Sequence, residues 1–392
     1  MKQRSIRTQL ALVYVVAGAA LAGIQAILPA LPAIQTTFGI DDSKVALVTS
    51  LFLLPSVLLT VPMGMLADRI GRRRVIACSL VVFGVAGLMM AFTVSTFSAL
   101  LAWRVVQGAA FAAILPLTIT LIGDVLSGAE QIASQGRRSV VMFAAEAILP
   151  VTGGALVLIS WSAPFALQAV TLPLGLVAWF VVPDVIDTST RAHRPSTRLV
   201  GLLRRPAVVA LGGLTFSRFF FKFAFLTYLP VLLVTNRGMA ESFAGVALGV
   251  FAASGLVAAV ASGRLAHHAT PARWIGIGLF GFGVSLALLA IELGPAAALA
   301  LAAIFGLADG LCGVFINGVT AEVASAELRA SFVAVSGTVR NIGKFLAPSV
   351  LGLLVLQMEL DAAFVVVAVA AFASLALVPV MRRALLPAAE VA

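Results

Sequence analysis

The chain has 392 residues, of which 61% are hydrophobic and only 11% are charged, and its formal net charge is +10. Soluble domains are about 45–50% apolar and about 25% charged, so a water-soluble core of this size is excluded and lipid must be the solvent. The two cysteines, Cys78 and Cys312, stand singly in apolar runs, which argues against a disulfide framework and against a metal site.

The first apolar run follows three basic residues near the N-terminus, Lys2, Arg4 and Arg7. A basic start followed by an apolar run is also the pattern of a secretory signal peptide. Here the apolar character persists from about Leu10 to Leu31, which is long enough to cross a bilayer at about 20 residues. We therefore expect a first membrane helix that is retained rather than cleaved.

Eleven further apolar segments follow, separated by short polar breaks, so the sequence predicts an all-α membrane protein of twelve helices. The expected helices cover residues 9–31, 45–67, 74–94, 97–122, 138–160, 163–183, 207–235, 241–264, 273–292, 295–320, 330–356 and 361–381. Several contain glycine and proline, which membrane helices tolerate because neighbouring helices satisfy the backbone groups that these residues leave open.

The distribution of basic residues predicts the orientation of these helices. Twelve spans put both termini on one side of the membrane, and the loops on that side hold 19 of the 26 basic residues, against only Lys44 and Arg237 on the other. The positive-inside rule makes the richer side the cytoplasm. We expect a multi-pass protein of the bacterial inner membrane, and the basic charge gives no reason to invoke nucleic acid.

The longest polar stretch follows the sixth predicted helix and carries two acids, five arginines and two prolines. It reads as a cytoplasmic linker. The sequence thus predicts two six-helix bundles, at residues 1–183 and 207–392, joined by a linker at residues 184–206.

The two halves repeat the same landmarks at an offset near 199 residues. Pro150 corresponds to Pro348, and Pro32 corresponds to Pro230. The segment that begins at Gly64 after the second helix also matches residues 263–268 after the eighth. Repeated six-helix halves are typical of secondary transporters, which place their substrate site near the bilayer midplane between the repeats.

The loop after the second predicted helix combines glycines and charges at close spacing. It reads Gly64-Met65-Leu66-Ala67-Asp68-Arg69-Ile70-Gly71-Arg72-Arg73-Arg74. Glycines let helix ends approach closely, and an aspartate beside arginines can lock one conformer through charge-assisted bonds. The alternative is a plain basic stop-transfer loop, which needs no glycine or aspartate at fixed positions. The segment resembles the loop motif of the major facilitator superfamily, which implies a conformational gate formed by Gly64, Asp68, Arg69, Gly71, Arg72 and Arg73.

Two more motifs resemble the twelve-helix drug:proton antiporters of that superfamily. One is Arg104-Val105-Val106-Gln107-Gly108 in the fourth predicted helix, and the other is Pro150-Val151-Thr152-Gly153-Gly154 in the fifth. The resemblance implies a proton-relay role for Arg104 and an antiporter motif at Pro150, Gly153 and Gly154. The chain departs from the pattern at Ala145 and Leu149, where glycine is usual. In the first helix, where related exporters often carry an acid, it has Gln25.

Seven ionisable residues fall inside the predicted spans, where each costs at least about 2.5 kcal/mol unless it is paired or faces water. They are Arg104, Glu146, Arg218, Lys222, Asp309, Arg340 and Lys344. The basic pairs at 218/222 and 340/344 each share one helix face, because residues four apart are neighbours on a helix. We expect both faces to look inward, in a midplane network where two acids partly neutralise five bases.

The excess of base favours an anionic or zwitterionic substrate, although these residues could instead tie the halves together as ion pairs without binding any substrate. Glu146 and Asp309 are the acidic candidates for the coupling proton, and Lys222 or Lys344 could serve instead. The phenylalanines of the seventh predicted helix are expected to serve mainly for packing and lipid contact.

We therefore predict a monomeric transporter that exports a small amphiphilic compound in exchange for protons by alternating access. A multidrug exporter of lipophilic cations, and a facilitator or importer of a small metabolite on the same fold, are the alternatives. An enzyme is not expected, because the chain shows no catalytic constellation. We also expect no metal and no cofactor.

Overall fold

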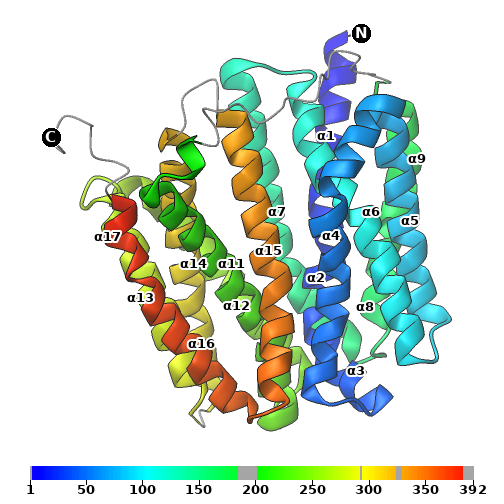
Figure 1. Ribbon diagram of the computed structural model, residues 1–392. Coiled ribbons are helices and arrows are strands. Elements are labelled where there is room, and N and C mark those ends of the chain that lie inside the picture. The colour runs from blue at the N-terminus through cyan, green and yellow to red at the C-terminus, as the bar shows by residue number, and fades with distance from the viewer. Residues whose placement is uncertain (1, 184–200, 292–293, 324–328, 383–392) are drawn as a thin grey trace, which may run out of the picture. The chain divides into compact units, whose positions relative to one another are not determined.

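The structure is a computed structural model that describes residues 2–183, 201–291, 294–323 and 329–382, and every regular element in these ranges is helical (Figure 1). Within them, eleven helical segments are long and apolar enough to cross a membrane, which supports the prediction of a multi-pass all-α protein. The eleventh predicted span forms a continuous helix, α15 (Arg329–Val355), but is not among the eleven. Arg340 and Lys344 in its middle lower its hydropathy.

The chain divides into two compact units. The first consists of Met1–Arg191 and Leu229–Gly249, and the second of Ala192–Tyr228 and Val250–Ala392. The elements of the first stretch are α1 (Lys2–Ala20), α2 (Ala22–Gln25), η1 (Leu28–Ala30), α3 (Leu31–Phe38), α4 (Asp42–Ile70), α5 (Arg72–Phe92), α6 (Phe97–Gly123), α7 (Gly128–Val157), α8 (Ala163–Ala166), η2 (Leu167–Val170) and α9 (Thr171–Val181). The later elements are α11 (Pro206–Val231), the π-helical η3 (Leu232–Asn236), α12 (Glu241–Leu265), α13 (Pro271–Leu289), α14 (Pro295–Val323), α15, α16 (Leu360–Ser374) and α17 (Leu377–Arg382). The predicted linker lies mostly outside the described residues.

The first membrane segment extends to Phe38, so its predicted end at residue 31 was too early. Within this segment the α-helix is interrupted by the 3-10 turn η1, which has Pro29 near its start. The helix then resumes as α3, which has Pro32 near its start. Proline suits the first turn of a helix because the N–H that it lacks has no intrahelical partner there. Gly39 ends α3 with a φ of 60°, a left-handed conformation that glycine adopts readily.

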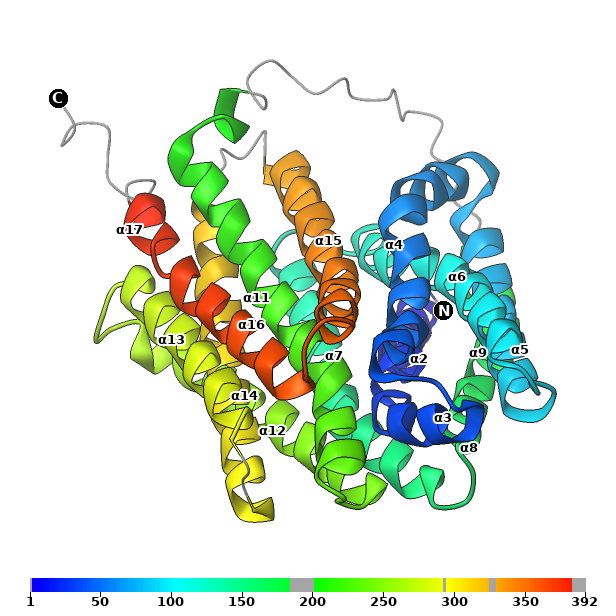
Figure 2. The same cartoon turned by 60° about the horizontal axis from the view of Figure 1, so that its bottom comes forward.

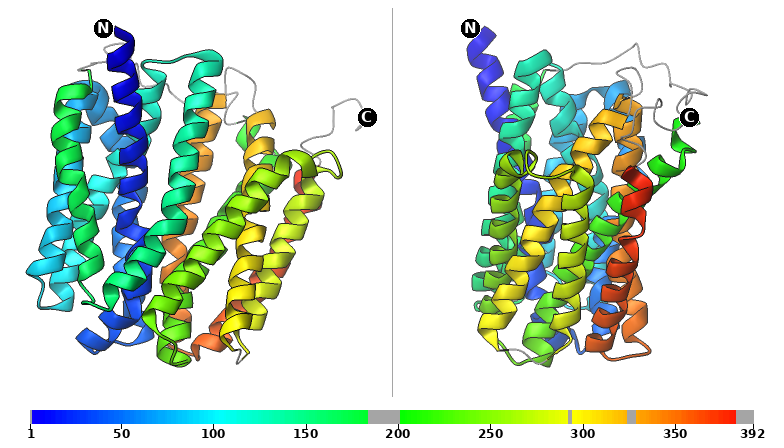
Figure 3. Two further views of the ribbon diagram at one scale, coloured as in Figure 1. Left: turned by 180° about the vertical axis from the view of Figure 1, so that it is seen from behind. Right: turned by 90° about the vertical axis from the view of Figure 1, so that its left-hand side faces the viewer.

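Helix α7 begins at Gly128, ten residues before the predicted start at 138. Its first three turns include Glu130 and Arg137, which are exposed. A hydropathy pattern marks only the apolar part of a helix, and this helix continues beyond that part. Figure 3 shows α7 lying along α1, against which it packs.

Helices α4, α5 and α6 form one packed group in the first unit (Figure 1). Helices α4 and α6 cross very closely at Gly108. A Cβ atom built on this glycine would lie 2.1 Å from the carbonyl oxygen of Phe52. In the second unit α13 packs against both α14 and α16 (Figure 2). There, a Cβ atom on Gly306 would lie 2.1 Å from the carbonyl oxygen of Phe251. The two crossings are 198–199 residues apart in sequence, so both units use the same helix contact at the offset of the sequence repeat.

Candidate functional site

A buried carboxylate binds two cations in the second unit. Oδ1 of Asp309 on α14 lies 2.8 Å from Nε of Arg218, and its Oδ2 lies 3.1 Å from Nζ of Lys222. Arg218 and Lys222 are one turn apart on α11, and all three side chains are buried. One carboxylate therefore holds two positive charges, which leaves this triad with a formal charge of +1 when all three groups are ionised.

A single aromatic ring gathers further positive charge beside the triad. The charged groups of Arg218, Arg340 and Lys344 lie 4.7, 5.6 and 5.2 Å from the ring centroid of Phe219. Cations at such distances are attracted by the ring's electron-rich face. Lys344 also lies 5.6 Å from the ring of Phe223. Phe219 thus brings α11 and α15 together and holds the two basic pairs of the sequence near each other.

We name this group the basic cluster and define it as Arg218, Phe219, Lys222, Asp309, Arg340 and Lys344. It holds four cations and one carboxylate. Among the described residues, the contact that holds the Arg340 guanidinium is the Phe219 ring. A ring face attracts a cation but carries no compensating negative charge, so the Arg340 guanidinium is held there, in the described part of the chain, without an acidic partner.

Arg104 has a different environment in the first unit. Its Nε donates to the carbonyl oxygen of Val48 at 2.8 Å, and its Nη1 donates to the carbonyl oxygen of Gly23 and to Oε1 of Gln107, both also at 2.8 Å. The guanidinium lies 4.3 Å from the ring centroid of Phe52, and the side chain is 1% exposed. All of these partners are neutral, so Arg104 ties α2, α4 and α6 together without an ion pair.

The two units place a buried cation over equivalent phenylalanines but supply it from different helices. Phe251 stands 199 residues after Phe52, and Lys222 lies 5.4 Å from its ring centroid. Lys222 in turn stands 199 residues after Gly23, whose backbone accepts from Arg104. In the first unit the cation belongs to α6 and binds backbone, whereas in the second it belongs to α11 and binds a carboxylate. The second arrangement thus contains an acidic group, Asp309, whereas the hydrogen-bond partners of Arg104 are all neutral.

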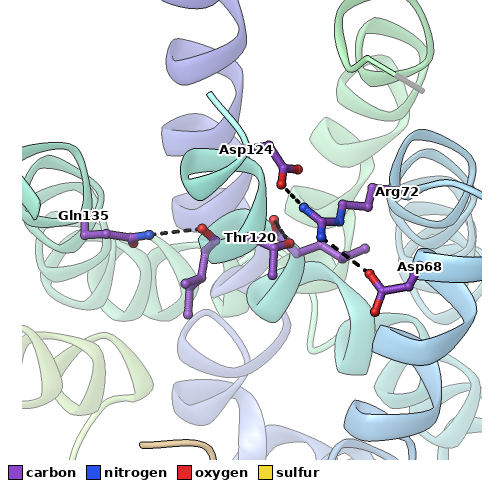
Figure 4. A network of polar contacts seen from close by, with 7 residues as sticks. Asp68, Arg72, Thr120, Asp124 and Gln135 are labelled. Atoms are coloured by element: carbon purple, nitrogen blue, oxygen red, sulfur yellow. Dashed lines mark hydrogen bonds and ion pairs between the residues drawn. The ribbon is translucent and has the colours of Figure 1, made fainter. Parts of the chain in front are cut away.

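The loop between α4 and α5 contains an ionic network (Figure 4). Arg72 donates to Asp124 at the end of α6 and also lies 3.5 Å from Asp68. Together the two contacts connect the ends of α4, α5 and α6. Gly71 joins α4 to α5 with a φ of 99° and a ψ of 134°, a conformation that residues with a side chain rarely adopt. The backbone geometry therefore favours glycine at position 71, and the network uses the charges of Asp68, Arg72 and Asp124.

Three other members of the predicted gate, Gly64, Arg69 and Arg73, have different surroundings. A Cβ atom on Gly64 would meet nothing within 4 Å, so the expectation that this glycine permits a close helix approach is wrong for this structure. Arg69 is exposed, and the guanidinium of Arg73 lies 5.6 Å from the ring centroid of Trp179.

The glycines of the fifth predicted helix pack against backbone. A Cβ atom on Gly153 would lie 2.1 Å from the carbonyl oxygen of Ala26, and one on Gly154 would lie 3.1 Å from Cα of Gly245. Pro150 is buried one turn before them. In this structure the motif lets α7 contact the break after α2 and the beginning of α12.

Gln25 is a buried residue of α2, and Glu146 is a partly exposed residue of α7, so both belong to the first unit. Asp124 and Phe219 are the residues that the sequence did not single out. Asp124 stands at the polar end of an apolar helix, and Phe219 lies among several other phenylalanines, so neither is marked by its own sequence context.

Relatives of known name match parts of this chain. An MFS-type transporter of Aspergillus terreus is 37% identical over 123 residues, which are 31% of this chain and 22% of the relative. The bacillibactin exporter of Bacillus subtilis is 25% identical over 36% of this chain and 37% of its own. Quinolone resistance protein NorA of Staphylococcus aureus is 27% identical over 41% of this chain and 40% of its own. The chain thus spans less than half the length of each of these curated relatives.

Solved structures share the fold over nearly the full length. A bacterial homologue of the human lysosomal transporter Spinster, in an inward-facing and unoccupied conformation, has a TM-score of 0.77 at 18% identity and covers 97% of this chain and 95% of its own. A POT family transporter in complex with 5-aminolevulinic acid has a TM-score of 0.78 at 14% identity, over 97% of this chain and 96% of its own. The sequence model of the Major Facilitator Superfamily matches residues 10–348. The chain belongs to the Major Facilitator Superfamily.

Proposed function

We propose that the protein is a secondary transporter that exports a small amphiphilic compound, anionic or zwitterionic, across the bacterial inner membrane in exchange for protons. The observation that carries the proposal is the basic cluster, in which Arg218 and Lys222 bind Asp309 while Arg340 and Lys344 lie at the Phe219 ring. Ionisable groups at membrane depth are costly, and they persist where they serve a substrate or an ion. An anionic group of the substrate would bind beside the Arg340 guanidinium, which lies at the Phe219 ring.

The topology that we propose has twelve spans, both termini in the cytoplasm and a monomeric assembly. It adds α15 to the eleven apolar segments, with its charged residues directed away from lipid. The contact of Arg340 and Lys344 with Phe219 on α11 supports that orientation. Transport would then proceed by rocking of the two halves around a site at the bilayer midplane.

Export is the proposed direction because the named relatives include a bacillibactin exporter and a quinolone resistance protein. The Gly153-Gly154 packing of α7 agrees with the antiporter motif found in the sequence. The acidic candidates for the coupling proton are Glu146 on α7 and Asp309 on α14, and Arg104 is the proposed relay.

The triad also favours a second candidate, an importer that carries an anion and a proton together. A proton on Asp309 would release Arg218 and Lys222 to bind an anion, and a bound anion would in turn favour that proton. Binding of the two would then be mutually favourable, as cotransport in one direction requires. Exchange requires that binding of the proton and binding of the substrate disfavour each other. In an exchanger the coupling proton would therefore bind to another group, such as Glu146.

Transport by the purified protein in liposomes distinguishes these functions. An exporter that exchanges protons accumulates a labelled anionic amphiphile against the direction of an imposed proton gradient, whereas a cotransporter accumulates it along that gradient. Counterflow that ignores the pH difference would identify a facilitator. The double variant Arg340→Gln/Lys344→Gln should abolish transport of anions, while Arg264→Gln, an exposed arginine at the end of α12, should not. Unchanged transport of anions by the double variant would contradict the proposal.

A further inference from the structure

A cavity of about 260 Å³ lies between α11, α14 and α15 in the second unit. Its walls include Val208 and Gly212 of α11 and Phe332 and Val339 of α15, so most of its surface is hydrocarbon. No residue of the basic cluster lines it. The cavity is therefore a site of its own, separate from the one that we propose for transport.

The hydroxyl groups at the cavity wall add little polarity. Thr215 donates its hydroxyl to the carbonyl oxygen of Leu211, and Thr320 donates to that of Ile316. Each hydroxyl is thus satisfied by its own helix, which leaves the hydroxyl of Ser336 as the remaining polar group of the lining side chains. Such a wall suits a hydrocarbon chain, because a polar group buried there would lose its hydrogen bonds to water and find few in return.

The cavity opens near the end of α11 that carries two arginines. Val209 lines it and is 59% exposed, whereas the other lining residues are buried or half-buried. The backbone N–H of Val209 donates to the carbonyl oxygen of Arg205 at 3.0 Å, so Arg205 stands one helical turn before the opening, on the same side of the helix. Leu203, which also lines the cavity, directly precedes Arg204. Both arginines are exposed.

A third exposed arginine lies at the same end of the second unit. A Cβ atom on Gly213 of α11 would lie 2.9 Å from Cδ1 of Leu377, so the beginning of α17 packs beside α11. From there α17 runs to the exposed Arg382, at the end of the unit where α11 begins (Figure 1). Positive charge therefore gathers at the helix end just outside the apolar cavity.

We infer that this cavity binds one acyl chain of an anionic phospholipid, whose phosphate lies beside Arg205. Complete ligand sites usually measure about 300–1,000 Å³, so a space of about 260 Å³ fits one part of a larger ligand. A phospholipid meets that condition, because its second chain stays in the bilayer. Its order of groups also matches the protein, with charge at the helix end and hydrocarbon one turn further in. Arginines at the membrane surface attract anionic lipid heads, which selects an anionic lipid over a zwitterionic one.

Native mass spectrometry of the full-length protein in detergent tests this site by measuring the dissociation constant of the first bound lipid. The probes are dioleoyl phosphatidylglycerol, which is anionic, and dioleoyl phosphatidylcholine, which has the same chains and no net charge. Phosphatidylglycerol should bind more tightly. Arg205→Gln should weaken its binding about fivefold, the contribution of one basic residue near an anionic lipid surface, and should leave phosphatidylcholine unchanged. Arg264→Gln, which removes an exposed arginine at the end of α12, is the charge-matched control and should change neither.

The acyl chain is tested by filling the cavity. Gly212→Leu does so from α11, because a Cβ atom there meets nothing within 4 Å, and it should weaken both lipids alike. The matched control is Gly276→Leu on α13, where a Cβ atom also meets nothing within 4 Å but which does not line the cavity. Val339→Phe fills the cavity from α15 and replaces the first variant should that fold poorly. Melting temperatures verify folding in each case.

Three results would overturn the inference. Equal binding of the two lipids by the unmodified protein would exclude an anionic head at Arg205. An equal loss in Arg205→Gln and Arg264→Gln would assign the preference to the net charge of the surface rather than to this site. Undiminished lipid binding by both cavity-filling variants would show that no chain enters the cavity.

Discussion

Lys222 lies with its Nζ 3.1 Å from Oδ2 of Asp309, in a buried ion pair that joins α11 to α14. The other oxygen of Asp309 is taken by Arg218. Removal of each partner therefore leaves a different buried charge. Without Lys222 a neutral carboxylate–guanidinium pair remains, whereas without the carboxylate two adjacent cations remain.

Asp309→Asn should therefore cost more stability than Lys222→Met. Loss of one partner that leaves a buried charge uncompensated costs about 3–5 kcal/mol of unfolding free energy. The methionine variant retains the Arg218 pair and fills similar space, so its loss should be smaller. Thermal unfolding of both variants in one detergent provides the comparison, and a methionine variant as unstable as the asparagine variant would contradict the charge argument.

Arg104→Lys should destabilise the first unit although it conserves the charge. The lysine cannot reproduce the bonds that Nε and Nη1 make to Val48 and Gly23. Hydrogen bonds from charged groups contribute about 1.5–3 kcal/mol each, and the melting temperature should fall accordingly. Unchanged stability combined with lost proton coupling would instead support the relay role that the family resemblance implies.

Asp124→Asn should impair transport as much as Asp68→Asn, because Asp124 binds Arg72 in the network at the ends of α4, α5 and α6. The effect should arise from a shift between conformers, since the bond holds one of them. Initial transport rates in liposomes and cross-linking of paired cysteines report the two consequences. Arg137→Gln, which changes an exposed arginine near the beginning of α7, is the control and should transport normally.

Asp41 precedes α4 and caps it, accepting a hydrogen bond from the backbone N–H of Lys44 at 3.0 Å. The hydroxyl of Ser43, helped by Lys44, lowers the pKa of Asp41 despite slight desolvation. A lowered pKa in the folded state means that the cap stabilises above the unfolded-state pKa of about 3.9 and that this contribution is lost as the pH falls through the folded value.

Asp41→Ala should therefore reduce stability by about 1 kcal/mol near neutral pH, as the loss of a helix N-cap does. Because the side chain is largely exposed, the change should lie at the low end of that effect. The difference from the unmodified protein should narrow below pH about 4. A stability difference that is the same at both ends of the pH range would contradict the assignment.

The positions of the membrane helices could be predicted from hydropathy alone, because each span must satisfy its backbone internally and expose apolar side chains to lipid. The errors occur where a helix continues beyond its apolar part, as at the beginning of α7, or where proline interrupts and restarts it, as after α2. The charged pairs of α11 and α15 were likewise visible, because charge inside an apolar run is rare.

The contacts among those residues could not be predicted in the same way. Which helix faces meet depends on rotation and tilt, and Phe219 became central only because α15 presents both of its basic residues to that ring. Asp124 was missed for a similar reason, since its partner is 52 residues away in sequence. Sequence spacing fixes neighbours on one helix, whereas the site consists of neighbours on different helices.

The most direct test of the central claim is ligand-induced thermal stabilisation of the purified protein by anionic, zwitterionic and cationic amphiphiles at two pH values. A ligand that binds the folded state raises its stability, by about 2.7 kcal/mol at a hundred times the dissociation constant. We predict that anions stabilise the protein and that Arg340→Gln/Lys344→Gln removes the effect while Arg264→Gln preserves it. Stabilisation by cations alone, abolished by neutralising Asp309 or Glu146, would contradict the account and make the basic residues structural partners in an exporter of lipophilic cations.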